Sequence, residues 1–158
     1  ADEIVTVCLA NRVRSVYAER RLRQWLPARP GLAIGSAGVE ARVGAEPDER
    51  ARTVALRRGV DFGSHLARAT ATLPRAVRRV FLVMEARHAM ALAQQFPEAH
   101  SHVFLLGSCL ESGSVEIPDP IDRPEAEYDA RFAEIDRALR RCVELLAARP
   151  VEVEERVR

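Results

Sequence analysis

The stretch that decides the fold is Ile4-Val5-Thr6-Val7-Cys8-Leu9-Ala10-Asn11-Arg12-Val13-Arg14-Ser15. Its first four residues form a β-branched run that favours a strand, and the run stops at Cys8. After a loop, apolar residues recur at helical spacing through Tyr17, Leu22 and Leu26. The stretch therefore predicts a strand, a loop that begins at Cys8 and a helix that begins near Ser15.

Further strands and helices alternate along the rest of the chain. Short apolar runs predict strands at 32–34, 80–83 and 103–106. Helical patterns predict a helix that Pro47 opens and Gly59 ends, one from Glu85 to Phe96, a broken helix around Pro74, and a last helix over 128–146. Strands that alternate with helices imply right-handed crossovers. We therefore expect an α/β fold of three layers, with a four-stranded parallel sheet and helices on both faces.

Length and composition limit the classes of function. The 158 residues fit one domain, which we place at 1–149, with a charged and frayed tail at 150–158. All 24 basic residues are arginines and are matched by 23 acidic residues, so a net charge of +1 gives no support for nucleic-acid binding. No apolar run approaches the roughly 18 residues of a membrane span, and the start is acidic where a signal peptide is basic. We expect a cytoplasmic protein without membrane insertion.

The cysteines and histidines show no metal-site spacing. Cys8, Cys109 and Cys142 are odd in number and form no C-x-x-C pair, so they predict neither a disulfide framework nor a zinc site. A single reactive thiol is still compatible with this count. His100 and His102 precede a strand without further ligand residues, and we expect them on the surface. The sequence therefore predicts no metal and no other cofactor.

The loop after the first strand carries the candidate chemistry. Ligands of parallel sheets bind at the carboxyl ends of the strands, where Cys8 and Arg14 stand six positions apart. Backbone N–H groups of a loop that enters a helix can cradle an anion, and a guanidinium can clamp two phosphate oxygens. The same positive surroundings favour the Cys8 thiolate, a nucleophile beneath a bound phosphate. In a chain this rich in arginine, a cysteine and an arginine six positions apart also occur by chance. The alternative role of Cys8 is that of a small apolar side chain buried at the end of a strand.

Five motifs in order carry a family resemblance. The loop C-x-G-N-x-C-R-S corresponds to residues 8–15, Ser-Ala-Gly to 36–38, His-x-x-Arg to 65–68, Val-Met-Glu to 83–85, and the late Asp-Pro to 119–120. With these motifs the chain, from Val5 to about Ala148, resembles the low-molecular-weight protein tyrosine phosphatases. Within them it is similar to the bacterial branch associated with capsule and exopolysaccharide tyrosine kinases. The resemblance implies a phosphotyrosine protein phosphatase I-like fold with flavodoxin-like topology.

The resemblance also implies an activity and a set of site residues. The reaction is hydrolysis of phosphotyrosine or another aryl phosphate monoester through a phosphocysteine, without metal or cofactor. Cys8 is the implied nucleophile, Asp119 the general acid and then base, and Ser15 a hydrogen-bond donor to the Cys8 sulfur. The phosphate would be held by Cys8, Leu9, Ala10, Asn11, Arg12, Val13 and Arg14, and the loop would be supported by Asn11, Ser36 and His65. The implied partners are a phosphotyrosine protein or a small aryl phosphate, and a cognate bacterial tyrosine kinase.

Several positions depart from the family pattern and keep alternatives open. Ala10 replaces a glycine, Arg12 an apolar residue and Val13 a second cysteine, and Ile121-Asp122 stand where aromatic residues are common. A catalytically weak phosphate-binding or phosphoprotein-binding module on the same fold is therefore the main alternative. A third is an arsenate reductase, which needs two more cysteines near the nucleophile. The absence of threonine at position 12 argues against a protein-arginine phosphatase.

Overall fold

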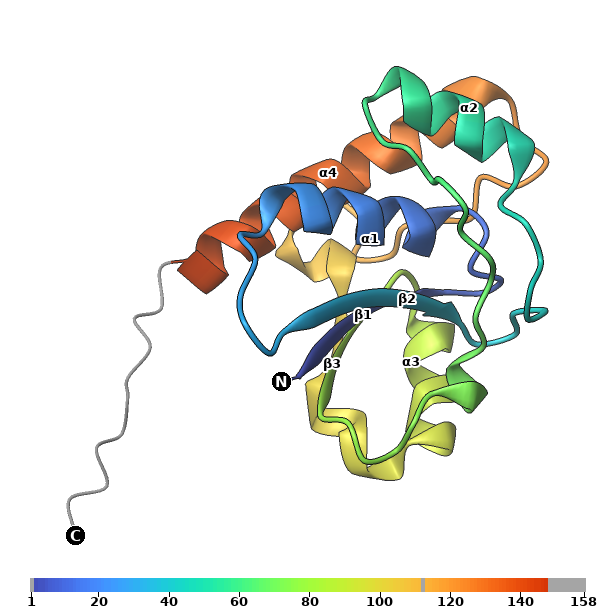
Figure 1. Ribbon diagram of the computed structural model, residues 1–158. Coiled ribbons are helices and arrows are strands. Elements are labelled where there is room, and N and C mark those ends of the chain that lie inside the picture. The colour runs from blue at the N-terminus through green and yellow to red at the C-terminus, as the bar shows by residue number, and fades with distance from the viewer. Residues whose placement is uncertain (1, 112, 148–158) are drawn as a thin grey trace, which may run out of the picture.

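Four parallel strands form a sheet in the order β2-β1-β3-β4 (Figure 1). The computed structural model describes residues 2–111 and 113–147, so the tail predicted at 150–158 lies outside the described residues. The strands are β1 (Glu3–Cys8), β2 (Ala33–Gly38), β3 (Arg79–Val83) and β4 (Val103–Leu105). The helices are α1 (Arg14–Trp25), α2 (Glu49–Arg57), α3 (Ala86–Gln95) and α4 (Glu125–Ala147), with 3₁₀ turns η1 (Thr70–Thr72), η2 (Pro97–His102) and η3 (Leu106–Cys109). The predicted four-stranded parallel sheet with flavodoxin-like order is confirmed.

Helices cover both faces of the sheet. Helices α1, α2 and α4 lie on one face and α3 lies on the other (Figure 1). Ile4 and Cys8 join the core under α1 and α4, whereas Val5 and Val7 join the core under α3. Side chains alternate along a strand, so a central strand between two helical layers must be apolar on both sides. This explains why the β-branched run at the start of the chain, Ile4-Val5-Thr6-Val7, is buried on both sides.

The chain reverses direction across the sheet next to β1. Strand β1 pairs with β2 on one side and with β3 on the other. The connections after β1 and β3 therefore lead to opposite edges of the sheet, which opens a crevice at the carboxyl ends of the two strands. Cys8 ends β1 and Val83 ends β3. The fold thus places the predicted loop at the crevice.

Strand β2 differs from the prediction. The sequence predicted a short strand at 32–34 that ends in Gly35-Ser36-Ala37-Gly38, whereas the strand includes these four residues and runs from Ala33 through Gly38. Glycine and alanine have low strand propensity, but pairing of Ser36 with Thr6 and of Gly38 with Cys8 overrides it. A Cβ atom on Gly38 would lie 2.5 Å from the carbonyl oxygen of Leu9. The small residues therefore let the loop after β1 lie directly on β2.

Other elements also differ from the prediction. The broken helix predicted around Pro74 is only the 3₁₀ turn η1, and β4 ends one residue early because Leu106 begins η3. Helix α2 begins at Glu49 rather than at Pro47, because the side chain of Asp48 accepts a hydrogen bond from the N–H of Ala51 and caps the helix. None of the helices in the described ranges is long and apolar enough to cross a membrane.

Candidate active site

The loop after β1 forms hydrogen bonds through its carbonyl groups with the segment that follows β2. The carbonyl oxygens of Cys8 and Leu9 accept hydrogen bonds from the N–H groups of Val39 and Glu40 at 3.1 and 2.9 Å. The N–H groups of residues 9–13 have no hydrogen-bond partner within the part of the chain that the structure describes. Unpaired N–H groups in a loop that runs into the N-terminus of a helix form an anion site. The loop is therefore built to receive an oxyanion.

Asn11 lies in this loop with a left-handed backbone, at a φ of 55°. Its Oδ1 accepts a hydrogen bond from the N–H of Arg68, and its Nδ2 donates to the hydroxyl groups of Ser15 and Ser36, all at 2.9 Å. The N–H of Arg68 can only donate, so it fixes the orientation of the amide and makes Nδ2 the donor to both hydroxyls. These bonds stabilise a conformation that asparagine tolerates better than most residues.

His65 forms a hydrogen bond with the backbone of Asn11. Its Nε2 lies 2.9 Å from the carbonyl oxygen of Asn11. Burial lowers the pKa of His65, against the hydrogen bond to Asn11, which favours the charged form. The ring is therefore neutral near pH 7, and since a carbonyl oxygen can only accept, the proton sits on Nε2.

The sulfur of Cys8 lies beside a hydroxyl group that can donate to it. Cys8 Sγ is 3.0 Å from Ser15 Oγ, and Cys8 is buried. Because Asn11 donates to Ser15 Oγ, the proton of that hydroxyl is free to point at sulfur. A hydroxyl that donates to sulfur stabilises the thiolate more than the thiol. The arrangement therefore suits a nucleophile and leaving group at Cys8.

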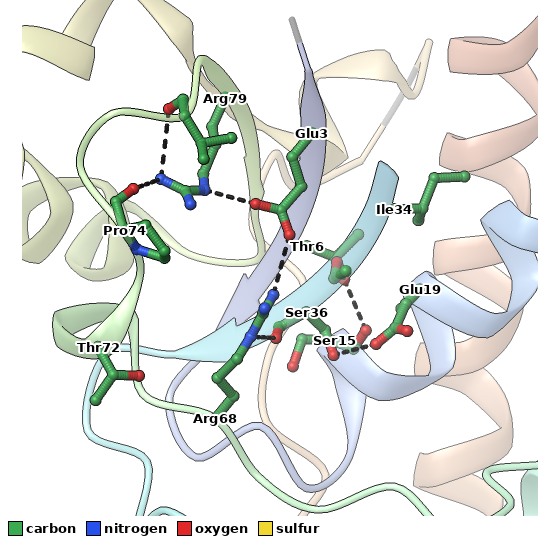
Figure 2. A network of polar contacts seen from close by, with 12 residues as sticks. Glu3, Thr6, Ser15, Glu19, Ile34, Ser36, Arg68, Thr72, Pro74 and Arg79 are labelled. Carbon is green, nitrogen blue, oxygen red and sulfur yellow. Dashed lines mark hydrogen bonds and ion pairs between the residues drawn. The ribbon is translucent and has the colours of Figure 1, made fainter. Parts of the chain in front are cut away.

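A second polar layer lies behind the loop (Figure 2). The hydroxyl of Ser36 donates to the Glu19 carboxylate, and the hydroxyl of Thr6 donates to the carbonyl oxygen of Ser15 at 2.7 Å. Ser36 thus accepts from Asn11 and donates to Glu19 in one chain of hydrogen bonds. A buried network in which each member is satisfied holds its side chains in one arrangement.

Arg68, a motif position without a role in the sequence argument, links this layer to the sheet. Its Nε donates to the carbonyl oxygen of Ser36 at 3.1 Å, and its Nη2 lies 3.3 Å from a carboxylate oxygen of Glu3 (Figure 2). The other oxygen of Glu3 lies 2.6 Å from Nε of Arg79 at the start of β3. The pair of arginines therefore shares one carboxylate across β1, β2 and β3.

Arg14 is fully buried at the start of α1. Its Nη1 donates to the carboxylate of Glu85 and, at 2.8 Å, to the carbonyl oxygen of Ile117, while its Nη2 pairs with Asp119 Oδ2 at 2.8 Å. Its Nε is buried and has no hydrogen-bond partner among the described residues. Nε and Nη2 present parallel N–H groups, which suit a tetrahedral oxyanion. The guanidinium therefore keeps one edge for a phosphate group.

Glu85 was quoted as part of a motif but given no role, and the structure brings it to Arg14. Burial disfavours its charge, but hydrogen bonds from Arg14 and Arg87 outweigh burial and lower the pKa of Glu85. Its backbone N–H donates to Nδ1 of His88 at 3.1 Å. Burial first, and then the nearby charge of Arg14, lowers the pKa of His88 to about 4. A neutral histidine and an ionised glutamate thus flank the guanidinium.

Asp119 lies at the rim of the same site. Its Oδ2 faces Arg14, its Oδ1 accepts from the N–H of Ile121 at 3.2 Å, and its side chain is 24% exposed. It is therefore the more exposed of the two carboxyl groups that pair with Arg14, and a proton or a water molecule can reach it from solvent. The bond to Ile121 is the turn contact typical of aspartate before proline, and it orients the carboxyl group toward Arg14.

Two departures from the family pattern have a local explanation. Positive φ values at non-glycine positions occur in the described ranges at Asn11 and Asp122, so Ala10 needs no glycine-like backbone. The side chain of Arg12 is bonded through Nε to the carbonyl oxygen of Glu46 at 2.6 Å. The side chain of Arg12 therefore binds the backbone of the segment before α2.

The structure places the predicted site residues together at the carboxyl end of β1. The group comprises Cys8, Leu9, Ala10, Asn11, Arg12, Val13, Arg14, Ser15, Ser36, His65 and Asp119. Sequence reasoning missed the roles of Glu85, Glu19 and Thr6. Glu85 stands two residues after the end of β3, and the rule that ligands bind at strand ends could have marked it. Glu19 and Thr6 lie inside elements and carry no such signal.

Comparisons with known proteins agree with this geometry. Residues 3–152 match the family model described as low molecular weight phosphotyrosine protein phosphatase. The low molecular weight protein-tyrosine-phosphatase Wzb of Salmonella typhi is 33% identical over 147 residues, which cover 93% of this chain and 95% of that protein. The probable phosphatase AmsI of Erwinia amylovora is 32% identical and covers 92% and 98%. The crystal structure of Wzb from Escherichia coli K30 in complex with sulphate has a TM-score of 0.82 at 35% identity, over 92% and 98% of the chains.

Proposed function

The chain belongs to the low molecular weight phosphotyrosine protein phosphatases, and we propose that Cys8, Arg14 and Asp119 carry out its reaction. It is a cysteine-dependent protein tyrosine phosphatase, a hydrolase, and the predicted place in the bacterial branch is confirmed by its similarity to Wzb and AmsI. The observation that supports these residue roles most is the loop that begins at Cys8, whose N–H groups at 9–13 have no partner among the described residues and which leads to the buried guanidinium of Arg14.

The substrate phosphate binds in the loop of residues 8–14. Its equatorial oxygens accept hydrogen bonds from the loop N–H groups and from Nε and Nη2 of Arg14. The related Wzb structure is a complex with sulphate, a tetrahedral oxyanion like phosphate, which supports the binding of a phosphate group by this chain. Asn11, Ser36 and His65 hold the loop so that the N–H groups need not reorganise when charge develops on phosphorus.

The first chemical step transfers the phosphoryl group to sulfur. The Cys8 thiolate attacks phosphorus in line with the leaving oxygen, so that a sulfur–phosphorus bond forms and the phosphorus–aryl oxygen bond breaks. Asp119 gives its proton to the leaving oxygen, and a phenol departs. Asp119 Oδ2 lies 2.8 Å from Nη2 of the same guanidinium, so the acid stands next to the bound phosphate.

The second step hydrolyses the phosphocysteine. Asp119, now a carboxylate, takes a proton from a water molecule whose oxygen attacks phosphorus. The sulfur–phosphorus bond breaks, inorganic phosphate leaves, and the Cys8 thiolate is restored. Ser15 donates to the departing sulfur and stabilises its negative charge. No metal or other cofactor takes part in this scheme.

The physiological setting is also part of the proposal. Residues 1–149 form one phosphatase domain that acts in the cytoplasm on a phosphotyrosine protein or a small aryl phosphate. The similarity to Wzb and AmsI favours a cognate bacterial tyrosine kinase as a partner. The balance of 24 basic against 23 acidic residues gives no support for a nucleic-acid partner.

Steady-state hydrolysis of p-nitrophenyl phosphate, and of phenyl phosphate as a substrate with a poorer leaving group, tests the residue roles. We expect Cys8→Ser to abolish turnover and Asp119→Ala to lower kcat by about 10²–10⁴ on substrates with poor leaving groups, because those need the proton most. EDTA should leave the wild-type rate unchanged.

Asp129→Ala is the matched control, because Asp129 also pairs with an arginine, Arg58, but lies on α4 outside the loop site. Its kcat should equal that of the wild type. A wild type as inert as Cys8→Ser that still binds vanadate would refute catalysis by Cys8.

A further inference from the structure

Cys109 and Cys142 are neighbours in space although 33 positions separate them. Their sulfur atoms lie 2.7 Å apart, and both residues are free thiols. Cys109 ends η3, which packs against α4, and Cys142 lies in the last part of α4. The cysteine spacing in the sequence gave no reason to expect this pair, and the phosphatase scheme does not use it.

The pair lies away from the phosphate loop. Tyr17, near the start of α1, stacks on Phe132 of α4 with ring centroids 4.0 Å apart. Trp25, at the end of α1, lies under the guanidinium of Arg140 at 5.1 Å. Helices α1 and α4 therefore run in the same direction, as Figure 1 shows. Cys142 stands two residues after Arg140 and so lies by the end of α1 that is remote from the loop. Cys8 is thus not a partner of this pair.

The surroundings of the two thiols shift their pKa values in opposite directions. The hydrogen bond with Cys142 lowers the pKa of Cys109 against the effect of burial, and the charge of Arg141 adds to this. The same hydrogen bond, together with burial, raises the pKa of Cys142. Cys109 also lines a surface groove with Arg137 and Arg140, so small solutes can reach it. Cys109 is therefore the more reactive thiol, since the thiolate is the nucleophile.

We propose that Cys109 and Cys142 form an intrachain disulfide when a peroxide oxidises them, independently of Cys8. The Cys109 thiolate attacks one oxygen of the peroxide, the oxygen–oxygen bond breaks, and the second oxygen leaves as water or alcohol after taking a proton. Cys109 is then a sulfenic acid. The sulfur of Cys142 attacks it, a sulfur–sulfur bond forms, and water leaves with the proton of Cys142. Two thiols are oxidised and one peroxide is reduced.

The bond would close a loop that contains the general acid. The segment from Cys109 to Cys142 includes Asp119 and most of α4. A disulfide across a loop of this length restricts the unfolded chain, and we expect the melting temperature to rise by about 5–10 °C. A sulfur–sulfur bond of about 2.05 Å requires the two sulfurs to approach by less than ~1 Å.

Peroxide treatment followed by mass spectrometry tests the proposal. The full chain, reduced and then treated with hydrogen peroxide, is alkylated and digested without reductant. We expect a cross-linked peptide that joins Cys109 to Cys142, in the wild type and equally in Cys8→Ser, with a higher melting temperature that a dithiol reductant reverses. A disulfide that contains Cys8, a disulfide between chains, or no cross-link would overturn the proposal.

The two single variants test the assigned order. In Cys142→Ser, a sulfenic-acid reagent such as dimedone should label Cys109, whereas in Cys109→Ser it should leave Cys142 unlabelled. Equal labelling of Cys109 in Cys142→Ser and of Cys142 in Cys109→Ser would contradict the assignment of Cys109 as the attacking thiol. Both variants should hydrolyse p-nitrophenyl phosphate at the wild-type rate when reduced, which separates the thiol pair from the phosphatase site.

Discussion

Asn11 is the residue whose backbone and side chain together define the phosphate loop. Its φ of 55° is left-handed, and its amide makes three hydrogen bonds, to Arg68, Ser15 and Ser36. Left-handed backbone is cheapest for glycine, but glycine has no amide to offer. The two contributions of Asn11, conformation and hydrogen bonding, can therefore be separated by substitution.

We predict that Asn11→Gly and Asn11→Ala both lower kcat for p-nitrophenyl phosphate, and that Ala is the worse of the two. Both lose the amide bonds, whereas only Ala adds the left-handed backbone penalty of about 1–2 kcal/mol. The measurement is kcat together with the free energy of unfolding in urea. Equal stability of the two variants would contradict the idea that the left-handed conformation must be enforced at Asn11.

Single residues also mark where sequence reasoning succeeded and where it stopped. Cys8, Arg14 and Ser15 are contiguous with the first strand, so their meeting follows from local chain geometry. Glu85 meets Arg14 only because the segment after β3 packs against the start of α1, and Glu19 on α1 meets Ser36 only because α1 packs against β2. Contacts of this kind depend on tertiary packing, and no local pattern predicts them.

At the scale of elements, the small residues of β2 leave room for the loop after β1. Gly38 pairs with Cys8, and a Cβ atom there would meet the backbone of Leu9 and of Asn11, at 2.5 and 2.8 Å. The sequence suggested that the Gly-Ser-Ala-Gly stretch ends the strand, because propensity alone disfavours these residues in a sheet. Pairing with β1 nevertheless continues the strand through Gly38, and the small residues there leave room for the loop.

We predict that Gly38→Ala lowers kcat far more than Gly35→Ala, although both lie in β2. The new methyl group at 38 would push on backbone that cannot move without displacing the loop, whereas at 35 it would meet mainly the flexible ends of the Arg68 and Glu3 side chains. Both variants should still unfold cooperatively. Parallel kinetics of p-nitrophenyl phosphate hydrolysis by the two variants provides the measurement, and equal kcat values would contradict a specific role of Gly38.

At the scale of the whole molecule, stability should depend on pH through buried groups near the site. His88 is fully buried, and its pKa is lowered to about 4 by burial and by the charge of Arg14. The unfolded chain binds a proton at this histidine near the usual value of about 6.5, so it takes up protons before the folded chain does. The contribution of His88 is therefore complete above about pH 6.5 and is lost as the pH falls toward 4.

We predict that the free energy of unfolding of the wild type falls more steeply between pH ~7 and pH ~4 than that of His88→Asn, by about 3 kcal/mol over the range. Asparagine can still accept the hydrogen bond from Glu85 N–H, so the variant keeps the helix cap. Glu85 and His65 titrate in both proteins and cancel in the comparison. Urea unfolding at a series of pH values measures the difference, and parallel curves would contradict a neutral buried His88.

The overall architecture was the most predictable level. Alternating apolar strands and amphipathic helices fix the sheet, its parallel sense and the carboxyl-end location of the site. The 3₁₀ turns η1, η2 and η3 and the approach of Cys109 to Cys142 were not predictable. They depend on how segments distant in sequence pack, which periodicity does not encode.

The central claim is that Cys8 carries the phosphoryl group between the two steps. It is tested most directly by trapping the intermediate in Asp119→Ala with p-nitrophenyl phosphate. This substrate has a good leaving group and needs little help from an acid in the first step, whereas the second step lacks its base. After rapid denaturation and digestion at mildly alkaline pH, we predict a mass increase of one phosphoryl group on the peptide that contains Cys8. No phosphorylated peptide, or a phosphoryl group on any residue other than Cys8, would contradict the account.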